Sequence, residues 1–170
     1  ILSKGDHLIT STYEHPSILN LAEQMLENEI EVTFIKPNKD GTIDKNKIES
    51  AIKQNTKLIS IMYVNNELGT INPIQAIGNI AHKHNILFHS DAVQFIGKEK
   101  LDIDNLKIDF LSMCAHKFYG PKGVGSLYCK KGIRFKPLID GGGQENGLRA
   151  GTENISAIAG MCKALEIAND

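Results

Sequence analysis

Two residues of this chain, Lys117 and Asp91, have types and settings that suit joint chemistry. Lys117 lies in the stretch SMCAHKFYGPKG, directly after a histidine and just before a turn rich in glycine and proline. Asp91 follows an apolar stretch, so we expect its carboxyl group to be partly buried and to need a partner. Alone, Asp91 is better explained as a helix N-cap or a structural ion pair, and Lys117 as an ordinary surface lysine. Together they indicate a lysine that bonds covalently to a cofactor and an acid that faces that cofactor.

This pair of groups is the one that pyridoxal 5'-phosphate requires. A lysine that forms a Schiff base has to be desolvated or electrostatically tuned. The acid keeps the pyridine nitrogen protonated, so that the ring accepts electrons from a substrate carbanion. We therefore predict that Lys117 is the attachment site and that Asp91 faces the ring nitrogen.

Other polar residues could bind the phosphate and the ring of such a cofactor. His116 and the glycine-rich stretch at 141–152, which leads into a helix, offer donors for a phosphate. Tight turns are nevertheless the common reason for glycine. His15 could stack on the ring, and Asn66 or Gln94 could donate to its phenolate oxygen. Each is alone more commonly a polar loop residue, and it is their places after successive strands that favour a site.

A sheet whose strands end beside these residues would position them. Short runs rich in Ile, Val, Leu and Phe predict strands, and amphipathic patterns between them predict helices. The strands are expected at 7–11, 31–37, 57–64, 86–92 and 123–129, and the helices at 16–29, 45–53, 74–85 and from near 152 onward. This alternation predicts an α/β fold with a mostly parallel sheet and helices on both faces. Ligands of such sheets bind beyond the carboxyl ends of the strands.

Composition and charge exclude several classes of protein. The 170 residues suit one domain, and a formal net charge of -1 gives no electrostatic reason to bind nucleic acid or an anionic membrane. No apolar run approaches the roughly 20 residues that span a bilayer, and no signal peptide is visible. The three cysteines have no metal or disulfide spacing, which suits a reducing compartment. We expect the cytoplasm, with an organelle as the alternative.

Five segments of the chain resemble the cysteine desulfurases, which are class V members of the pyridoxal-phosphate aminotransferase superfamily. These segments, in the family's order, are TYEHPSIL, VNNELGTINPI, HSDAVQFIGK, DFLSMCAHKFYGPKGVGSLY and GGGQENGLRAGTEN. The resemblance implies that residues 1–170 are part of a large cofactor-binding domain of fold type I. It also implies a homodimer that converts L-cysteine into L-alanine and an enzyme-bound persulfide. The sulfur would pass to an iron–sulfur scaffold or to another acceptor protein.

The resemblance implies roles around the cofactor ring. Lys117 matches the lysine that holds the cofactor, and Asp91 matches the acid on the pyridine nitrogen. His15 matches the imidazole that stacks on the ring and can shuttle protons. Asn66 and Gln94 match the residues on the side of the phenolate oxygen.

The resemblance also implies contacts to the phosphate. His116 matches one such contact, and Thr152 matches a threonine that reaches the phosphate of the partner subunit. Cys114 stands where the family usually has a phosphate-binding serine. A thiol is a weaker donor and is larger, so we expect a somewhat lower cofactor affinity. Cys129 and Cys162 are expected in the core.

Two parts of the family's machinery are expected outside this chain, namely the nucleophilic cysteine and the arginine that binds the substrate carboxylate. Because the chain begins with Ile1 in a strand-like pattern, we expect a piece of a longer protein that also has an upstream segment and a downstream small domain. A class V aminotransferase or a selenocysteine lyase would use the same cofactor residues. A non-catalytic binding or scaffold domain is a further alternative. A Rossmann domain is disfavoured, because no G-x-G-x-x-G lies between the first strand and helix.

Overall fold

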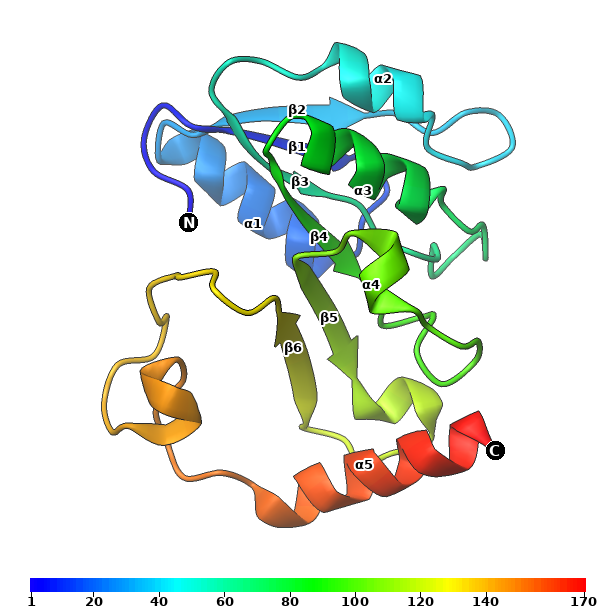
Figure 1. Cartoon of the computed structure of the whole chain (residues 1–170), viewed down its shortest axis with the longest axis vertical. Helices are drawn as coiled ribbons and strands as arrows, with labels where there is room; N and C mark the ends of the chain where they lie inside the picture. Colours follow the sequence, from blue (N-terminus) through cyan, green and yellow to red (C-terminus); the bar gives the residue numbers. More distant parts are fainter.

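The computed structural model describes residues 1–170 and contains one six-stranded sheet with the strand order β2-β1-β3-β4-β5-β6 (Figure 1). Neighbouring strands from β2 to β5 are parallel, and β6 runs antiparallel to β5. The strands are β1 (His7–Ser11), β2 (Glu31–Ile35), β3 (Thr56–Ser60), β4 (Leu87–Asp91), β5 (Phe110–Cys114) and β6 (Gly125–Cys129). The predicted mostly parallel α/β sheet is confirmed.

Helices cover both faces of this sheet, as the sequence predicts. The α-helices are α1 (Pro16–Glu27), α2 (Lys45–Ser50), α3 (Ile74–Lys83), α4 (Ile103–Leu106) and α5 (Ile155–Asn169), and the 3-10 helices are η1 (Ala115–Phe118) and η2 (Gln144–Gly147). Alternate strand residues point to opposite faces. Ile9, Ile59 and Phe88 are fully buried in one core with residues of α2 and α3. Leu8 and Leu58 face the other side and lie near α1.

The largest differences from the predicted elements concern β5 and the ends of β3. The run Phe110–Cys114 forms a strand that the sequence pattern did not predict, because Ser112 and Cys114 interrupt its apolar character. Strand β3 ends at Ser60, four residues before the predicted end. Beyond it, the backbone N–H of Tyr63 still donates a hydrogen bond to the backbone carbonyl of Asp91 at 2.8 Å. The strand propensity of a segment contains no information about the neighbouring strands or about where the sheet ends.

Helix α5 lies beside η1 at the lower edge of the molecule in Figure 1. It begins at Ile155, capped by Asn154, rather than near 152. Close approaches need glycine here: a Cβ on Gly97 would lie 2.5 Å from Phe118 Cβ, and one on Gly160 would lie 2.6 Å from Pro121 Cγ. These two glycines let the chain pack tightly around η1.

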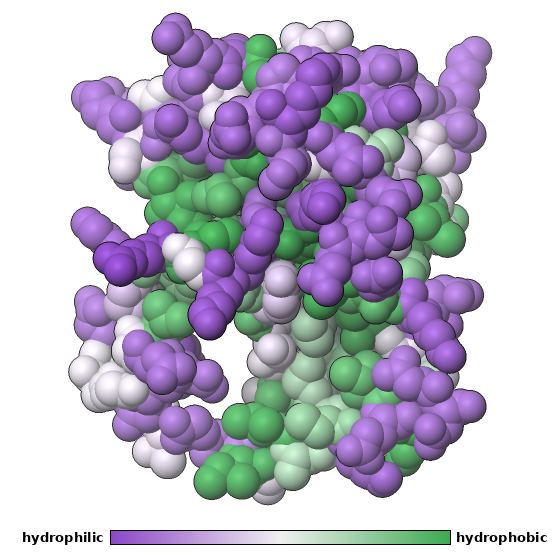
Figure 2. Space-filling view, viewed as in Figure 1, coloured by the Kyte–Doolittle hydropathy of each residue, from purple (hydrophilic) through white to green (hydrophobic).

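Several large apolar side chains are exposed along α5 and in the loop before it. Figure 2 shows hydrophobic residues in both halves of the molecule, with one group at the lower edge where α5 begins. The exposed apolar side chains of this part are Leu138, Ile139, Leu148, Ile155, Ile158 and Ile167. Cys162 is exposed on α5 and Cys129 is half-buried on β6, outside the buried core, so the prediction that both lie in the core is wrong. Only one stripe of α5, with Ala157 and Met161, is buried. None of the helices combines the length and the apolar character that crossing a membrane requires.

Candidate active site

The carboxyl ends of β1, β3, β4 and β5 meet at one edge of the sheet, and the predicted site residues other than Thr152 follow or end these strands. From β1 the chain passes to β2 through α1, and from β2 to β3 through α2, on opposite faces. The boundary between β1 and β3 is therefore a topological switch point, where α/β sheets bind ligands. The segments that follow these strands carry His15, Asn66, Asp91 and Lys117.

Asp91 ends β4 as a buried carboxyl group that forms no ion pair. Its residue is 8% exposed, and burial raises the pKa of its carboxyl group. The backbone N–H of Val93, at 3.0 Å from Oδ1, and the charge of His15 act in the opposite direction. A buried carboxylate normally has a cationic partner, and no lysine or arginine supplies one here. Asp91 is therefore suited to face a cation that does not come from this chain.

His15 caps helix α1 at the end of the β1–α1 turn. Its Nδ1 accepts a hydrogen bond from the backbone N–H of Ser17 at 3.2 Å, and Pro16 follows as the first helical residue. Because Nδ1 is an acceptor, the neutral ring carries its proton on Nε2. The ring is exposed and close enough to Asp91 for its charge to act on that carboxyl group. His15 can therefore present a donor to a ligand at this edge.

Lys117 lies on η1, directly after β5. Ala115 and Phe118 anchor η1 in the core, whereas His116 and Lys117 are exposed. The Lys117 amine forms no hydrogen bond and no ion pair, so it is free to react. The desolvation expected of a Schiff-base lysine is not provided by this chain alone.

Cys114 lies between Asp91 and Lys117 and is half-buried. Burial raises the pKa of its thiol, the charge of Asp91 raises it further, and the N–H and charge of Lys117 act in the opposite direction. Its Sγ lies 3.9 Å from His116 Nε2. A thiol with a raised pKa stays protonated at neutral pH and is a poor nucleophile. Cys114 is thus a neutral neighbour of the predicted phosphate site rather than a reactive group.

The remaining predicted residues occupy the periphery of this group. Asn66 is exposed on the turn after β3, and the half-buried Gln94 accepts from Lys98 Nζ at 3.0 Å. Thr152 is exposed in the loop before α5, and no hydrogen bond joins its side chain to another predicted site residue. Electrostatic interactions thus link His15 to Asp91, and link Cys114 to both Asp91 and Lys117, whereas Thr152 lies apart from them.

Buried polar residues that the sequence did not single out hold the two turns of the switch point together. Asn65 Nδ2 donates to the carbonyl of Tyr13 at 2.9 Å, and its Oδ1 accepts from the backbone of Glu67 and Leu68. Asn72 Nδ2 donates to the Met62 carbonyl at 2.8 Å. The adjacent asparagines after β3 were the visible signal, but only the structure shows that Asn65 is buried while Asn66 is exposed.

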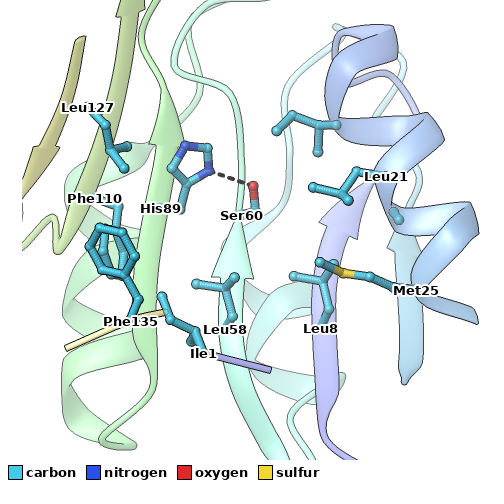
Figure 3. Close-up of a pocket in the computed structure, with 12 residues that line it drawn as sticks. Ile1, Leu8, Leu21, Met25, Leu58, Ser60, His89, Phe110, Leu127 and Phe135 are labelled. Carbon is cyan, nitrogen blue, oxygen red and sulfur yellow. Dashed lines mark hydrogen bonds between the residues drawn. The ribbon is translucent and has the colours of Figure 1, made fainter. Parts of the chain in front are cut away.

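An apolar groove of about 240 Å³ lies on the α1 face, away from Lys117 (Figure 3). Leu8 and Leu58 of the sheet, Leu21 and Met25 of α1, and Phe135 line it. Its polar groups are confined to the hydroxyl of a serine and the ring of a histidine. A catalytic pocket usually has several convergent polar groups, so this groove is not the candidate active site.

His89 links three strands through this groove face. Its Nδ1 lies 2.8 Å from Ser60 Oγ on β3, and its Nε2 lies 2.8 Å from Ser112 Oγ on β5 (the first contact is drawn in Figure 3). Burial lowers the pKa of His89 from 6.5 to about 4. His89 is two residues before Asp91 on β4, so this chain of hydrogen bonds fixes the strands that carry Asp91 and Lys117.

The lowered pKa of His89 predicts an acid-sensitive fold. Between pH 6.5 and about 4 the unfolded chain takes up a proton at this position that the folded chain does not, so stability falls as the pH falls. The whole shift corresponds to about 3 kcal/mol, and because the groove admits water we expect roughly 1 to 3 kcal/mol. Urea unfolding at pH 7 and pH 4.5 should show a smaller difference for His89→Gln than for the wild type. The exposed His82→Gln is the matched control, and equal pH dependence in both variants would contradict this prediction.

The residues at this edge fit pyridoxal phosphate. They include a buried acid without a cationic partner, an unpaired lysine on η1 directly after the neighbouring strand, and a histidine that presents Nε2–H. His116 and the Cys114 thiol are further donors next to that lysine. These are the group types that a pyridine nitrogen, an aldehyde and a phosphate require.

The whole chain matches one family model, and similar proteins are known. Residues 1–170 match the family described as Aminotransferase class-V. The chain is 48% identical to "Cysteine desulfurase IscS" of Dictyoglomus turgidum over 166 residues, covering 98% of this chain and 42% of that protein. It is 46% identical to "Cysteine desulfurase, mitosomal" of Encephalitozoon cuniculi, covering 96% of this chain and 38% of that protein. The solved structure "SspA in complex with cysteine" superposes with a TM-score of 0.93 at 47% identity, over 95% of this chain and 47% of that one. The chain thus spans less than half the length of these relatives.

Proposed function

The chain belongs to the aminotransferase class-V family, and on that premise we propose that the full-length protein is a pyridoxal-phosphate-dependent cysteine desulfurase. It would convert L-cysteine into L-alanine and keep the sulfur as a persulfide on a cysteine outside these 170 residues. The observation that carries the proposal is that the unpaired Lys117 and the buried, unpaired Asp91 lie where the neighbouring strands β5 and β4 end, in a chain 48% identical to a cysteine desulfurase. Residues 1–170 would form part of its large domain.

The residues of the carboxyl edge would hold the cofactor. Lys117 would bind it covalently, Asp91 would face the ring nitrogen, and His15 would lie against the ring. Asn66 and Gln94 would serve the phenolate oxygen, and His116, Cys114 and the partner subunit's threonine at the position of Thr152 would serve the phosphate. When bound, pyridoxal phosphate supplies an electron sink for the substrate carbanion.

The chemical roles of this chain concern protons and charge. The Lys117 amine would act as the general base that takes the proton from the substrate α-carbon. Asp91 would stay ionised and keep the ring nitrogen protonated. His15, with its proton on Nε2, would donate to a leaving or entering group on the opposite side.

Product analysis of the full-length protein tests this proposal. With added pyridoxal phosphate and a thiol reductant, L-cysteine should give alanine and sulfide in equal amounts. Dependence on a keto acid acceptor would indicate an aminotransferase, and activity confined to selenocysteine would indicate a selenocysteine lyase. A protein with neither a cofactor absorbance band nor sulfide release would be a binding or scaffold domain.

The assembly of the protein is part of the proposal. The exposed apolar side chains before and along α5, with the detached position of Thr152, support a homodimer in which Thr152 serves the partner's site. The persulfide would pass to an iron–sulfur scaffold or to another acceptor. Three free thiols suit the reducing cytoplasm, and a mitosomal relative makes an organelle the alternative. Sedimentation of the full-length protein and of a Leu148→Glu variant tests the dimer.

Replacing Cys114 by serine should strengthen cofactor binding. A hydroxyl is a better hydrogen-bond donor than a thiol, and a neutral hydrogen bond contributes about 1 kcal/mol, which corresponds to roughly fivefold in affinity. Equilibrium titration of the cofactor-free protein, followed by absorbance, measures this. Cys129→Ser, on β6, is the control. Unchanged or weaker binding by Cys114→Ser would show that this position does not serve the phosphate.

A further inference from the structure

Glu14 is a buried carboxyl group for which the proposed reaction gives no role. It precedes His15 in the β1–α1 turn and is 3% exposed. Its Oε1 accepts from the hydroxyl of Ser11, at the end of β1, and from the backbone N–H of Met62, after β3, at 3.2 Å. Its Oε2 is buried and has no hydrogen-bond partner. One carboxyl group thus joins the two strands that form the topological switch point.

The charge around Glu14 favours its neutral form. Burial raises its pKa from 4.5 to about 7, the charge of Asp91 on β4 raises it further, and the bonds from Ser11 and Met62 act in the opposite direction. Tyr13, in the same turn, is the other titratable group that faces Glu14, and its own pKa is raised. No lysine or arginine pairs with Glu14.

We propose that Glu14 is a positioning residue of the active site: its buried carboxyl group ties the turn that carries His15 to the segment after β3, and its protonation decides whether Asp91 has a second buried charge near it. The inference rests on the proposed function for the role of His15. A purely structural residue would affect only the stability of the fold. In the role proposed for Glu14, both the tether to the turn of His15 and the protonation of the carboxyl group affect the reaction.

Three variants of the full-length protein separate the tether from the charge. Glu14→Gln keeps an acceptor for Ser11 and Met62 but never ionises. Glu14→Ala removes the tether and the charge, and Ser11→Ala weakens the tether while the carboxyl group stays. The first readout uses the cofactor-free protein: the NMR signal of the His15 ring, assigned with His15→Gln, should keep its wild-type position in Glu14→Gln and move in Glu14→Ala.

The second readout is the pH profile of the loaded protein with L-cysteine. Wild-type kcat should change near pH 7 as Glu14 ionises, and Glu14→Gln should lack that step while its KM stays within about twofold of the wild type. Glu14→Ala should lose roughly a hundredfold in kcat, the usual cost of a displacement of about 1 Å. Ser11→Ala should fall between them and keep the pH step.

Each outcome decides the proposal. A His15 signal that is the same in all variants, or a pH step that persists in Glu14→Gln, would overturn it. Should Glu14→Ala fail to fold, Glu14→Gln and Ser11→Ala still give both readouts. If the wild type forms no cofactor band, the proposed function fails, whereas the His15 signal of the cofactor-free protein still tests the tether.

Discussion

Lys117→Ala should abolish covalent attachment of pyridoxal phosphate to the full-length protein and lower sulfide release from L-cysteine by about a thousandfold or more. The structure gives two reasons. The Lys117 amine is free of hydrogen bonds and ion pairs, so it is the nucleophile available to the cofactor at this edge. It would also be the general base for a substrate bound at this edge, and loss of a general base typically costs 10²- to 10⁴-fold.

Borohydride reduction followed by peptide mass spectrometry measures the attachment. Wild type should carry the reduced cofactor on Lys117, and Lys117→Ala should carry none. Lys122→Ala, in the exposed turn five residues later, is the matched control and should behave as wild type. A reduced, covalently bound cofactor in Lys117→Ala would show that another lysine holds it.

Asp91→Asn should have the second-largest effect, with kcat lower by roughly a hundredfold to a thousandfold. The amide keeps an oxygen that accepts from the Val93 N–H, so the end of β4 retains its shape. The substitution removes the negative charge that would face the protonated ring nitrogen. Because Asp91 is buried, loss of this charge pair is expected to cost more free energy than it would at the surface. Removing one partner of such a pair costs about 2 to 5 kcal/mol. KM for L-cysteine should change little, because Asp91 faces the cofactor.

A pH titration of the cofactor absorbance band separates this effect from misfolding. In Asp91→Asn the bound ring should lose its proton at lower pH than in the wild type. Asp102→Asn is the control, because Asp102 caps α4 through the Asn105 N–H and asparagine is an equally good cap. Identical titration curves for Asp91→Asn and the wild type would contradict the assignment of Asp91.

Residue type and periodicity predicted the sheet and the edge at which the site lies. Apolar runs located β1 and β4, and the residues just after them, His15 and Asp91, could be inferred because parallel strands end at a common edge. Strand β5 could not be predicted from its own composition, since its burial comes from β4 and β6 on either side.

The contacts that hold the site depend on register, which a sequence pattern does not contain. His89 reaches Ser60 and Ser112 only because β3, β4 and β5 are aligned as they are. Glu14 likewise stands among four polar residues after β1, and nothing in that run indicates which one turns inward. The exposure of Lys117 was also unpredicted, because chemistry suggested a covered amine.

The strand order has a consequence for the time course of folding. His15 follows the first strand in the sequence, whereas Lys117 follows the fifth. Each parallel pairing has to close a long loop, and the entropy cost of closing it comes before the stabilising contacts between the strands form. A ribosome-bound chain that has emerged only as far as β4 would contain Asp91 and His15 but not Lys117. Capture of the cofactor would therefore come last, and it would mark molecules in which strand β5 has already docked. Time-resolved absorbance during refolding would then report completion of the sheet and not its nucleation.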